Sequence, residues 1–200
     1  MGIYIGAGAL KGLYLDTDAV KKIYLDADVV FQARATDVLF DNGWVDGVSW
    51  AGNLLPRPQY TSVATYSFGY VESEGFMRLT VNSSSSYSNV NHNCHVCTAE
   101  AITVPANATS MRVQAKVTST ASPQMYMKFG LLTADCVNSM DDSNGGVLSS
   151  LLTPTSTVSE YTLALPSGVA GGQFYAIVNA RRTAQASSLR NLDIYKVWFE

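Results

Sequence analysis

This sequence of 200 residues has little of three things: basic charge, long apolar runs and cysteine. Thirteen Lys and Arg stand against sixteen Asp and Glu, a net charge of -3, so the basic excess that drives binding to nucleic-acid phosphates is missing. No apolar run approaches the roughly 20 residues that a membrane span needs. We therefore expect neither nucleic acid nor a membrane as a partner.

The sequence also lacks the signs of secretion and of common catalytic sites. Gly2, Gly6 and Gly8 interrupt the apolar N-terminus and no Lys or Arg precedes it, so we expect no secretory signal peptide and synthesis in the cytoplasm. There is no Gly-x-Ser-x-Gly elbow, phosphate-binding glycine loop or His-Glu-x-x-His motif, and we expect a protein that is not an enzyme. A hydrophobic content of 47% with 14% charged residues indicates a globular chain.

A repeat of ten residues occupies the N-terminus, with units that begin at Ile3, Leu13 and Ile23. Each unit places an aliphatic-Tyr-aliphatic triplet before Gly-x-Gly or Asp-x-Asp, which is typical of a strand followed by a tight turn. About four short strands in a β-meander are predicted over residues 1–33. Because so small a ribbon is marginal alone in water, we expect it to act in docking or oligomerisation.

The paired aspartates of the repeat have two interpretations. Asp16, Asp18, Asp26 and Asp28 could bind calcium through clustered carboxylate oxygens, or they could be turn residues. We favour the turn, because the first repeat unit has glycines at the same positions.

Residues 34–200 are predicted to form an antiparallel β-sandwich of the jelly-roll type, after a linker at Gln32–Thr36. Apolar residues alternate with polar ones in several segments, as expected of strands with one face in the core. A short helix is expected only at Val147–Leu152, after two glycines. The predicted strands include Phe76–Val81, Met111–Thr118, Gln124–Phe129, Tyr161–Leu165, Phe174–Val178 and Ile194–Phe199.

Both histidines and two of the three cysteines lie within six residues. His92, Cys94, His95 and Cys97, with Cys136 as a distant further ligand, could bind zinc. In a strand, however, His92 and Cys94 would point away from His95 and Cys97, so only a loop could bring them together. A disulfide between Cys97 and Cys136 and packed free thiols are the alternatives. We expect no obligatory cofactor.

Aromatic side chains are the candidates for ligand binding, since the chain has eleven Tyr and three Trp and flat amphipathic rings stack on sugars. Trp44 and Trp50 flank the segment Val45-Asp46-Gly47-Val48-Ser49. Tyr126 lies between Met125 and Met127, which should take the core face and leave its ring outside. Arg181 and Arg182 follow a predicted strand and could bind a carboxylate or an acidic sugar. The aromatic residues could instead belong to the core, and paired arginines are often solvated.

The repeat units resemble the short N-terminal repeats of structural proteins from phages and prophages of Gram-positive gut bacteria. The resemblance covers residues 1 to about 33 and departs from the usual glycine-rich turns in its Asp-x-Asp pairs. The rest resembles the carbohydrate-binding jelly rolls that phage tail and fibre proteins carry, notably at Leu39–Trp44 and at the closing segment Leu192–Phe199.

This resemblance implies a virion protein made in the cytoplasm of a bacterial host. The repeat would attach it to other virion proteins or make a homo-oligomer, and the sandwich would bind host-surface carbohydrate. Three alternatives stay open: a capsid-decoration or head-fibre protein without a specific ligand, a free carbohydrate-binding module, and a small glycan-active enzyme.

Overall fold

The chain divides into two compact units, Met1–Thr36 and Asp37–Glu200. The predicted boundary after residue 33 lies outside the described residues and stays a prediction. The described residues form strands, turns and loops without a helix. The computed structural model describes residues 10–16, 19–25, 28–32, 37–45, 47–53, 64–83, 91–120, 124–134, 146–183 and 188–200.

The first unit contains an antiparallel sheet with the order β1-β2-β3. Its strands are β1 (Leu10–Asp16), β2 (Ala19–Leu25) and β3 (Asp28–Gln32). Ile23 of β2 stands opposite Leu13 of β1 and Phe31 of β3, so apolar residues of the three strands fall in one row. The meander is confirmed for residues 10–32, and the repeat unit before Leu10 lies outside the described residues.

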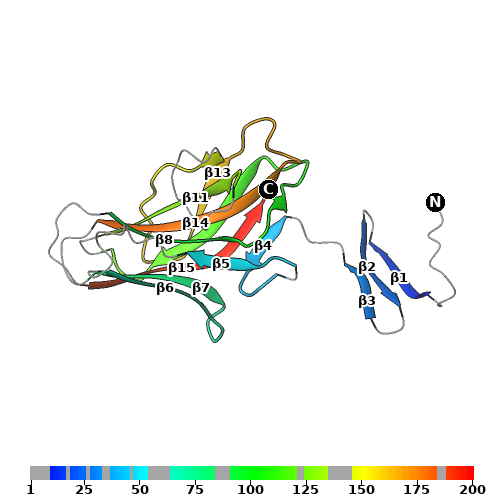
Figure 1. Cartoon of the computed structure of the whole chain (residues 1–200), viewed down its shortest axis with the longest axis horizontal. Coiled ribbons are helices and arrows are strands. Elements are labelled where there is room, and N and C mark those ends of the chain that lie inside the picture. The colour runs from blue at the N-terminus through cyan, green and yellow to red at the C-terminus, as the bar shows by residue number, and fades with distance from the viewer. Residues whose placement is uncertain are drawn as a thin grey trace. The chain divides into compact units, whose positions relative to one another are not determined.

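The second unit is a sandwich of two antiparallel sheets, which Figure 1 shows as two layers. Sheet I has the order β13-β10-β15-β7-β6, and a further short strand, β4, pairs with β15. Its strands are β4 (Val38–Asp41), β6 (Ala64–Val71), β7 (Phe76–Ser83), β10 (Ser110–Val117), β13 (Ser159–Ala164) and β15 (Ser188–Phe199).

Sheet II has the order β12-β11-β14-β8-β5, and β9 pairs with β14. Several neighbouring strands come from distant parts of the chain, such as β7 with β15 in sheet I and β8 with β14 in sheet II, as expected of a jelly roll rather than of consecutive hairpins alone. The strands of sheet II are β5 (Trp50–Asn53), β8 (Asn91–Thr98), β9 (Ile102–Thr103), β11 (Met125–Leu132), β12 (Gly146–Leu148) and β14 (Gln173–Thr183).

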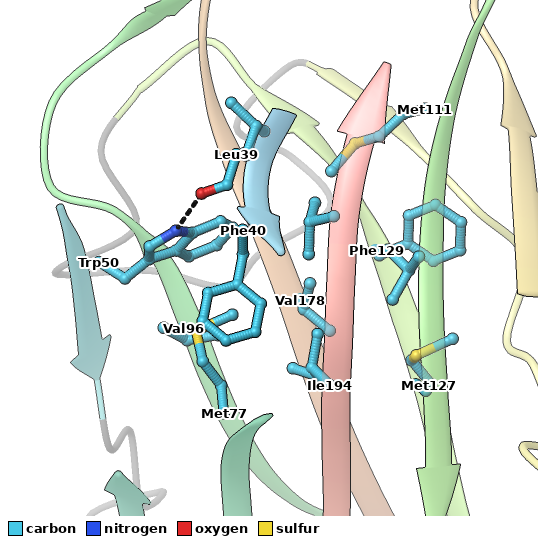
Figure 2. Close-up of a cluster of buried hydrophobic side chains, with 14 of the residues drawn as sticks. Leu39, Phe40, Trp50, Met77, Val96, Met111, Met127, Phe129, Val178 and Ile194 are labelled. Carbon is cyan, nitrogen blue, oxygen red and sulfur yellow. Dashed lines mark hydrogen bonds between the residues drawn. The ribbon is translucent and has the colours of Figure 1, made fainter. Parts of the chain in front are cut away.

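The core lies between the two sheets and is built by alternation along the strands. In β10, Met111, Val113 and Ala115 are fully buried while the residues between them are partly exposed, because successive side chains of a strand point to opposite faces. Figure 2 shows Met127 and Phe129 of β11 packed in the same layer with side chains from sheet I. This confirms the β-sandwich that the alternation predicted.

The prediction of a short helix at Val147–Leu152 is wrong. Residues 146–148 form strand β12, which pairs with the end of β11, and Leu152 makes an isolated bridge with Met127. The carbonyl and amide of Leu152 both bond to Met127, at 3.0 and 2.8 Å. Pairing with a neighbouring strand therefore overrides the weak local tendency of this segment.

Candidate functional site

The predicted ligand residues fall into different environments. Trp44 is 48% exposed, whereas Trp50 is buried and its indole Nε1 donates a hydrogen bond to the carbonyl of Leu39 at 3.1 Å (Figure 2). Arg182 is also fully buried. Trp50 and Arg182 are therefore parts of the interior and present no surface to a ligand in this structure.

Tyr126 and Arg181 come together on sheet II. They are direct partners in the pairing of β11 with β14, and both are half-buried. Their chain neighbours Met125, Met127 and Ala180 belong to the core, so the two side chains lie on the outer side of the sheet. The reasoning that placed Tyr126 outside is thus supported by the burial of Met125 and Met127.

Two rows of polar side chains cross the outer side of sheet II. Arg181 has Tyr126 on one side and Asn93 of β8 on the other. One step along the strands, Asn179 stands between Lys128 and His95 in the same way. We call this surface the polar face, and it consists of Asn93, His95, Tyr126, Lys128, Asn179 and Arg181.

The polar face has a buried floor and a more exposed rim. His95 is fully buried and Asn179 is 3% exposed, while the other members are half-buried. Buried polar side chains are costly unless they are hydrogen-bonded. On this side of the sheet, burying apolar side chains would cost less free energy than burying His95 and Asn179. We therefore take the polar face as the candidate binding site.

The polar face ends at an apolar cluster. The next row along the strands contains Cys97 and Ile177, which pack with Leu132, and Leu148 and Tyr175 lie against them. Cys97 is disulfide-bonded, while Cys94 is a buried free thiol. Cys136, the remaining cysteine, lies outside the described residues. The structure thus agrees with a disulfide at Cys97 rather than with packed thiols alone.

The zinc site proposed for the His-Cys segment does not assemble around β8. Cys94 lies in the core between the sheets, His95 belongs to the polar face, and the sulfur of Cys97 is already bonded to another sulfur. Burial raises the pKa of the Cys94 thiol to about 12, so it stays protonated and a poor metal ligand. The side chain of His92 lies outside the described part. Among the described residues, no three His, Cys, Asp or Glu gather as a metal site would require.

The calcium interpretation of the repeat stays a prediction. Asp16 ends β1 and Asp28 begins β3, while Asp18 and Asp26 lie outside the described residues. The side chains of this unit are outside the described residues. The turn interpretation agrees with where the strands end.

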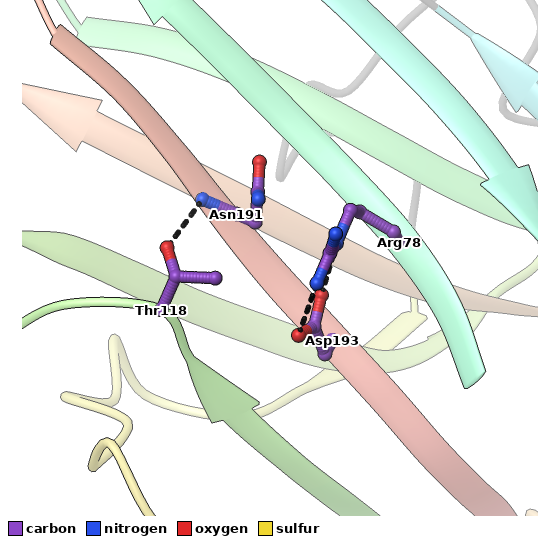
Figure 3. A network of polar contacts seen from close by, with 4 residues as sticks. All are labelled: Arg78, Thr118, Asn191 and Asp193. Carbon is purple, nitrogen blue, oxygen red and sulfur yellow. Dashed lines mark hydrogen bonds and ion pairs between the residues drawn. The ribbon is translucent and has the colours of Figure 1, made fainter. Parts of the chain in front are cut away.

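The outer side of sheet I carries a different, ion-paired surface. The guanidinium of Arg78 donates two hydrogen bonds to the fully buried carboxylate of Asp193, at 2.7 and 2.8 Å (Figure 3). The hydrogen bond to Asp193 raises the pKa of Arg78. The backbone amide of Asn191, two residues before Asp193, donates to the hydroxyl of Thr118 at 3.3 Å. Charges on this surface are thus already matched within the protein.

Aromatic rings fill the space beside this ion pair. The rings of Phe76 and Tyr195 lie 5.2 Å apart, and the Arg78 guanidinium lies 4.8 Å from the Phe76 ring. Lys116 covers Tyr195, with its ammonium 5.3 Å from the ring, and a hydrogen bond to Tyr195 raises the pKa of Lys116. Charged side chains of this surface thus cover its own aromatic groups.

Sequence reasoning missed most of the polar face, although the signal was present. Lys128 follows Tyr126 by two residues in a strand that was predicted, so the two had to share a side. Asn179 precedes Arg181 by two residues, but the predicted strand ended at Val178. His95 was considered only as a metal ligand. The pairing of β8 with β14, which joins these residues, carries no local signal.

Comparison with known proteins gives the fold but no family. No family model matches the chain, and no curated protein matches it. A solved structure of a carbohydrate-binding module of promiscuous specificity from the β-sandwich superfamily is similar, with a TM-score of 0.50 and 13% identity over 90% of this chain and 71% of that chain. The described part of the chain has no helix long and apolar enough to cross a membrane.

Two further structures are similar at lower scores. A family 11 carbohydrate-binding module from Clostridium thermocellum, in complex with a β-1,3-1,4-mixed-linked tetrasaccharide, has a TM-score of 0.48 and 11% identity, over 82% of this chain and 94% of that one. A family 29 module mutant complexed with mannohexaose has a TM-score of 0.42 and 13% identity, over 82% and 89% of the two chains. The match at a TM-score of 0.50 shows the fold alone, an antiparallel β-sandwich like that of the carbohydrate-binding module.

Proposed function

We propose that the sandwich is a non-catalytic glycan-binding domain and that the polar face is its contact surface. The observation that carries the proposal is the alignment of six polar or aromatic side chains in two rows across β8, β14 and β11. They stand on three adjacent strands of one sheet, in which β14 pairs with β8 on one side and with β11 on the other. A site on such a scaffold is more rigid than one on loops.

The chemistry of these side chains suits a sugar. The Tyr126 ring offers a flat surface for the apolar side of a pyranose, and its hydroxyl can donate or accept a hydrogen bond. The amide of Asn93, which is half-buried, offers a donor and an acceptor, as a sugar hydroxyl requires. His95 and Asn179 are buried and form the floor beneath the more exposed side chains.

Two cations in the rows favour acidic sugars. Arg181 and Lys128 both belong to the polar face, and both are half-buried rather than enclosed. An Arg guanidinium can bind a carboxylate through two parallel hydrogen bonds. We therefore propose that glycans containing uronic or sialic acids bind more tightly than neutral ones, with an affinity that falls as salt is added.

The proposal is tested by glycan-array screening followed by calorimetry on the best ligand. Tyr126→Ala and Arg181→Ala should each weaken binding about tenfold, the loss of roughly 1.4 kcal/mol. Arg112→Ala is the matched control, because Arg112 is a partly exposed arginine on the outer side of sheet I. If both polar-face variants kept their affinity for the glycan and their melting temperature, the polar face would be excluded as the glycan-binding surface.

We further propose that the protein is a virion component, with the N-terminal meander as its attachment element. The support is the division of the chain into two units and the resemblance of the decapeptide repeat to those of phage structural proteins. Repeated copies on a particle would turn weak sugar contacts into strong attachment. Decoration of a capsid without a specific ligand and a free carbohydrate-binding module are the alternative roles.

Light scattering tests the attachment role. The full chain and a chain lacking residues 1–33 are compared, since residues 37–200 form a compact unit with its own core. A full-length oligomer that becomes a folded monomer on truncation supports assembly through the meander. A monomer in both cases contradicts self-assembly and directs the search toward a different virion protein as partner.

A further inference from the structure

A small apolar cluster is buried on the outer side of sheet II, apart from the main core. Cys97 of β8 stands opposite Ile177 of β14, and Leu132 of β11 packs with them. Their neighbours along the strands, such as Val96 and Val178, point into the main core, so these three side chains point outward. Their exposed fractions are nevertheless only 1%, 2% and 3%. The outer side of the sheet is therefore covered at this cluster.

The disulfide of Cys97 has one partner available in this chain. The chain has three cysteines, Cys97 is disulfide-bonded and Cys94 is a free thiol. The partner is therefore Cys136, which follows β11 and precedes β12 in the sequence and lies outside the described residues.

Strand geometry explains why Cys97 is bonded and Cys94 is free. The two residues are three positions apart on β8, so their side chains point to opposite sides of sheet II. Cys94 lies in the main core, where its thiol donates to the carbonyl of Ser67 at 3.7 Å. Burial raises the pKa of this thiol to about 12, so it forms little of the thiolate that attacks disulfides. Cys94 is thus excluded from thiol exchange.

The bonded sulfur lies one row away from the polar face. Cys97 follows His95 by two residues on β8, and Ile177 precedes Asn179 by two residues on β14. The row of Cys97 continues through Gly130 of β11, which pairs with Ile177 on one side and with β12 on the other. A covalent bond at Cys97 therefore acts on a row that crosses four adjacent strands, β8, β14, β11 and β12.

We propose that oxidation of Cys97 and Cys136 to a disulfide is a maturation step, which converts a less stable reduced sandwich into the final form. Among the described residues, the main core does not include Cys97, so the two sheets can pack before the bond forms. The bond closes a loop of about forty residues, which restricts the unfolded chain and so stabilises the folded one. This step goes beyond glycan binding and does not depend on it.

The oxidation is a thiol–disulfide exchange with a small disulfide such as glutathione disulfide. The thiolate of one cysteine attacks the oxidant, which releases one glutathione and leaves a mixed disulfide on the protein. The thiolate of the second cysteine then attacks the protein sulfur of that mixed disulfide and releases the second glutathione. The protein gives up two electrons and two protons, and one glutathione disulfide becomes two thiols. Because the cytosol keeps thiols reduced, we expect the oxidised form outside it.

Counting thiols in the full-length protein tests the bond. One sample is kept in dithiothreitol and the other is treated with glutathione disulfide, and both are alkylated in denaturant after the reagents are removed. Mass spectrometry should find three labelled cysteines in the reduced sample and one, Cys94, in the oxidised sample. The matched control Cys94→Ala should still form the bond and carry no label once oxidised. Labelling of Cys97 in the oxidised parent, or a bond between two chains, would overturn the inference.

Melting temperature and hydrogen exchange test the stabilising role. The oxidised parent should melt about 5–15 °C above the reduced parent. Cys97→Ser and Cys136→Ser should melt like the reduced parent, with or without oxidant. Amide exchange should be slower around Leu132 and Ile177 in the oxidised parent, because the bond restrains this row, and unchanged in β10. Equal melting temperatures of the oxidised and reduced parent, or equal exchange around Ile177, would overturn the maturation step even if the bond forms.

Discussion

Tyr126 of β11 and Arg181 of β14 stand directly opposite each other across two central strands of sheet II. The pairing puts a flat ring beside a guanidinium on the outer side of the sheet, with Asn93 of β8 next in the row. Directly opposed side chains on one face of an antiparallel pair lie close enough to interact. A ligand that contacts one of them therefore meets the other.

This relationship predicts coupled losses in binding. If Tyr126→Ala and Arg181→Ala each weaken glycan binding about tenfold, the double variant should lose less than the product, because the remaining residue no longer holds the sugar in register. We expect a coupling energy of about 0.5–1 kcal/mol from a double-mutant cycle by calorimetry. The pair of Tyr126→Ala with Arg112→Ala is the control and should be additive.

Gly130 makes possible a close approach between β11 and β12. A Cβ at Gly130 would lie 2.0 Å from the carbonyl oxygen of Val147, and φ there is 155°. We expect Gly130→Ala to lower the free energy of unfolding by about 2–3 kcal/mol through overpacking against backbone. Gly69→Ala is the matched control, since a Cβ there has nothing within 4 Å. Urea denaturation measures both, and equal stability of the two variants would contradict the contact.

The ion pair of Arg78 with Asp193 should stabilise the sandwich more than a surface pair. Arg78→Met leaves a fully buried carboxylate without its bidentate partner. Because the arginine side chain is 32% exposed, we expect a loss of about 2–3 kcal/mol, below the range for fully buried pairs. Arg112→Met, whose partners Glu160 and Glu200 are exposed, should cost at most about 1 kcal/mol. Chemical denaturation of both variants at neutral pH measures the two losses. Equal losses would contradict the larger contribution of the Arg78–Asp193 pair.

The burial of the Cys94 thiol predicts that the protein loses stability at alkaline pH. Burial raises the pKa of its thiol from 9.0 to about 12, so the unfolded chain releases this proton first as the pH rises. The protonated thiol's contribution to the free energy of unfolding is complete below pH 9.0 and is lost as the pH approaches 12. Cys94→Ala should lose less stability than the parent between pH 8.5 and 10, roughly 1 kcal/mol less at the upper limit. Parallel unfolding curves of parent and variant over this range would contradict the burial of an un-ionised thiol.

Reactivity gives a second check on the same thiol. A protonated thiol in the core should resist alkylation at pH 8 in the native protein and react after denaturation. Fast labelling of Cys94 in the folded protein, identified by mass spectrometry of peptides, would show that the thiol is accessible.

Local sequence determined the fold class and the side on which many residues lie. The alternation in Met111–Thr118 and Gln124–Phe129 appears in the structure as β10 and β11, with the predicted apolar residues in the core. A period of two residues is a property of the strand itself, so it can be read without knowing the partner strand. The ten-residue repeat likewise marked the strands of the N-terminal meander.

The tertiary structure decided which of these residues share a surface. Trp44 and Trp50 are six residues apart, yet one is half exposed and the other donates its N–H to Leu39 within the core. Arg181 and Arg182 are adjacent, and only Arg181 reaches the polar face. His95 joins that face because β8 pairs with β14, more than 80 residues later in the chain. Strand order and register depend on packing between distant segments, and the sequence carries no local signal for them.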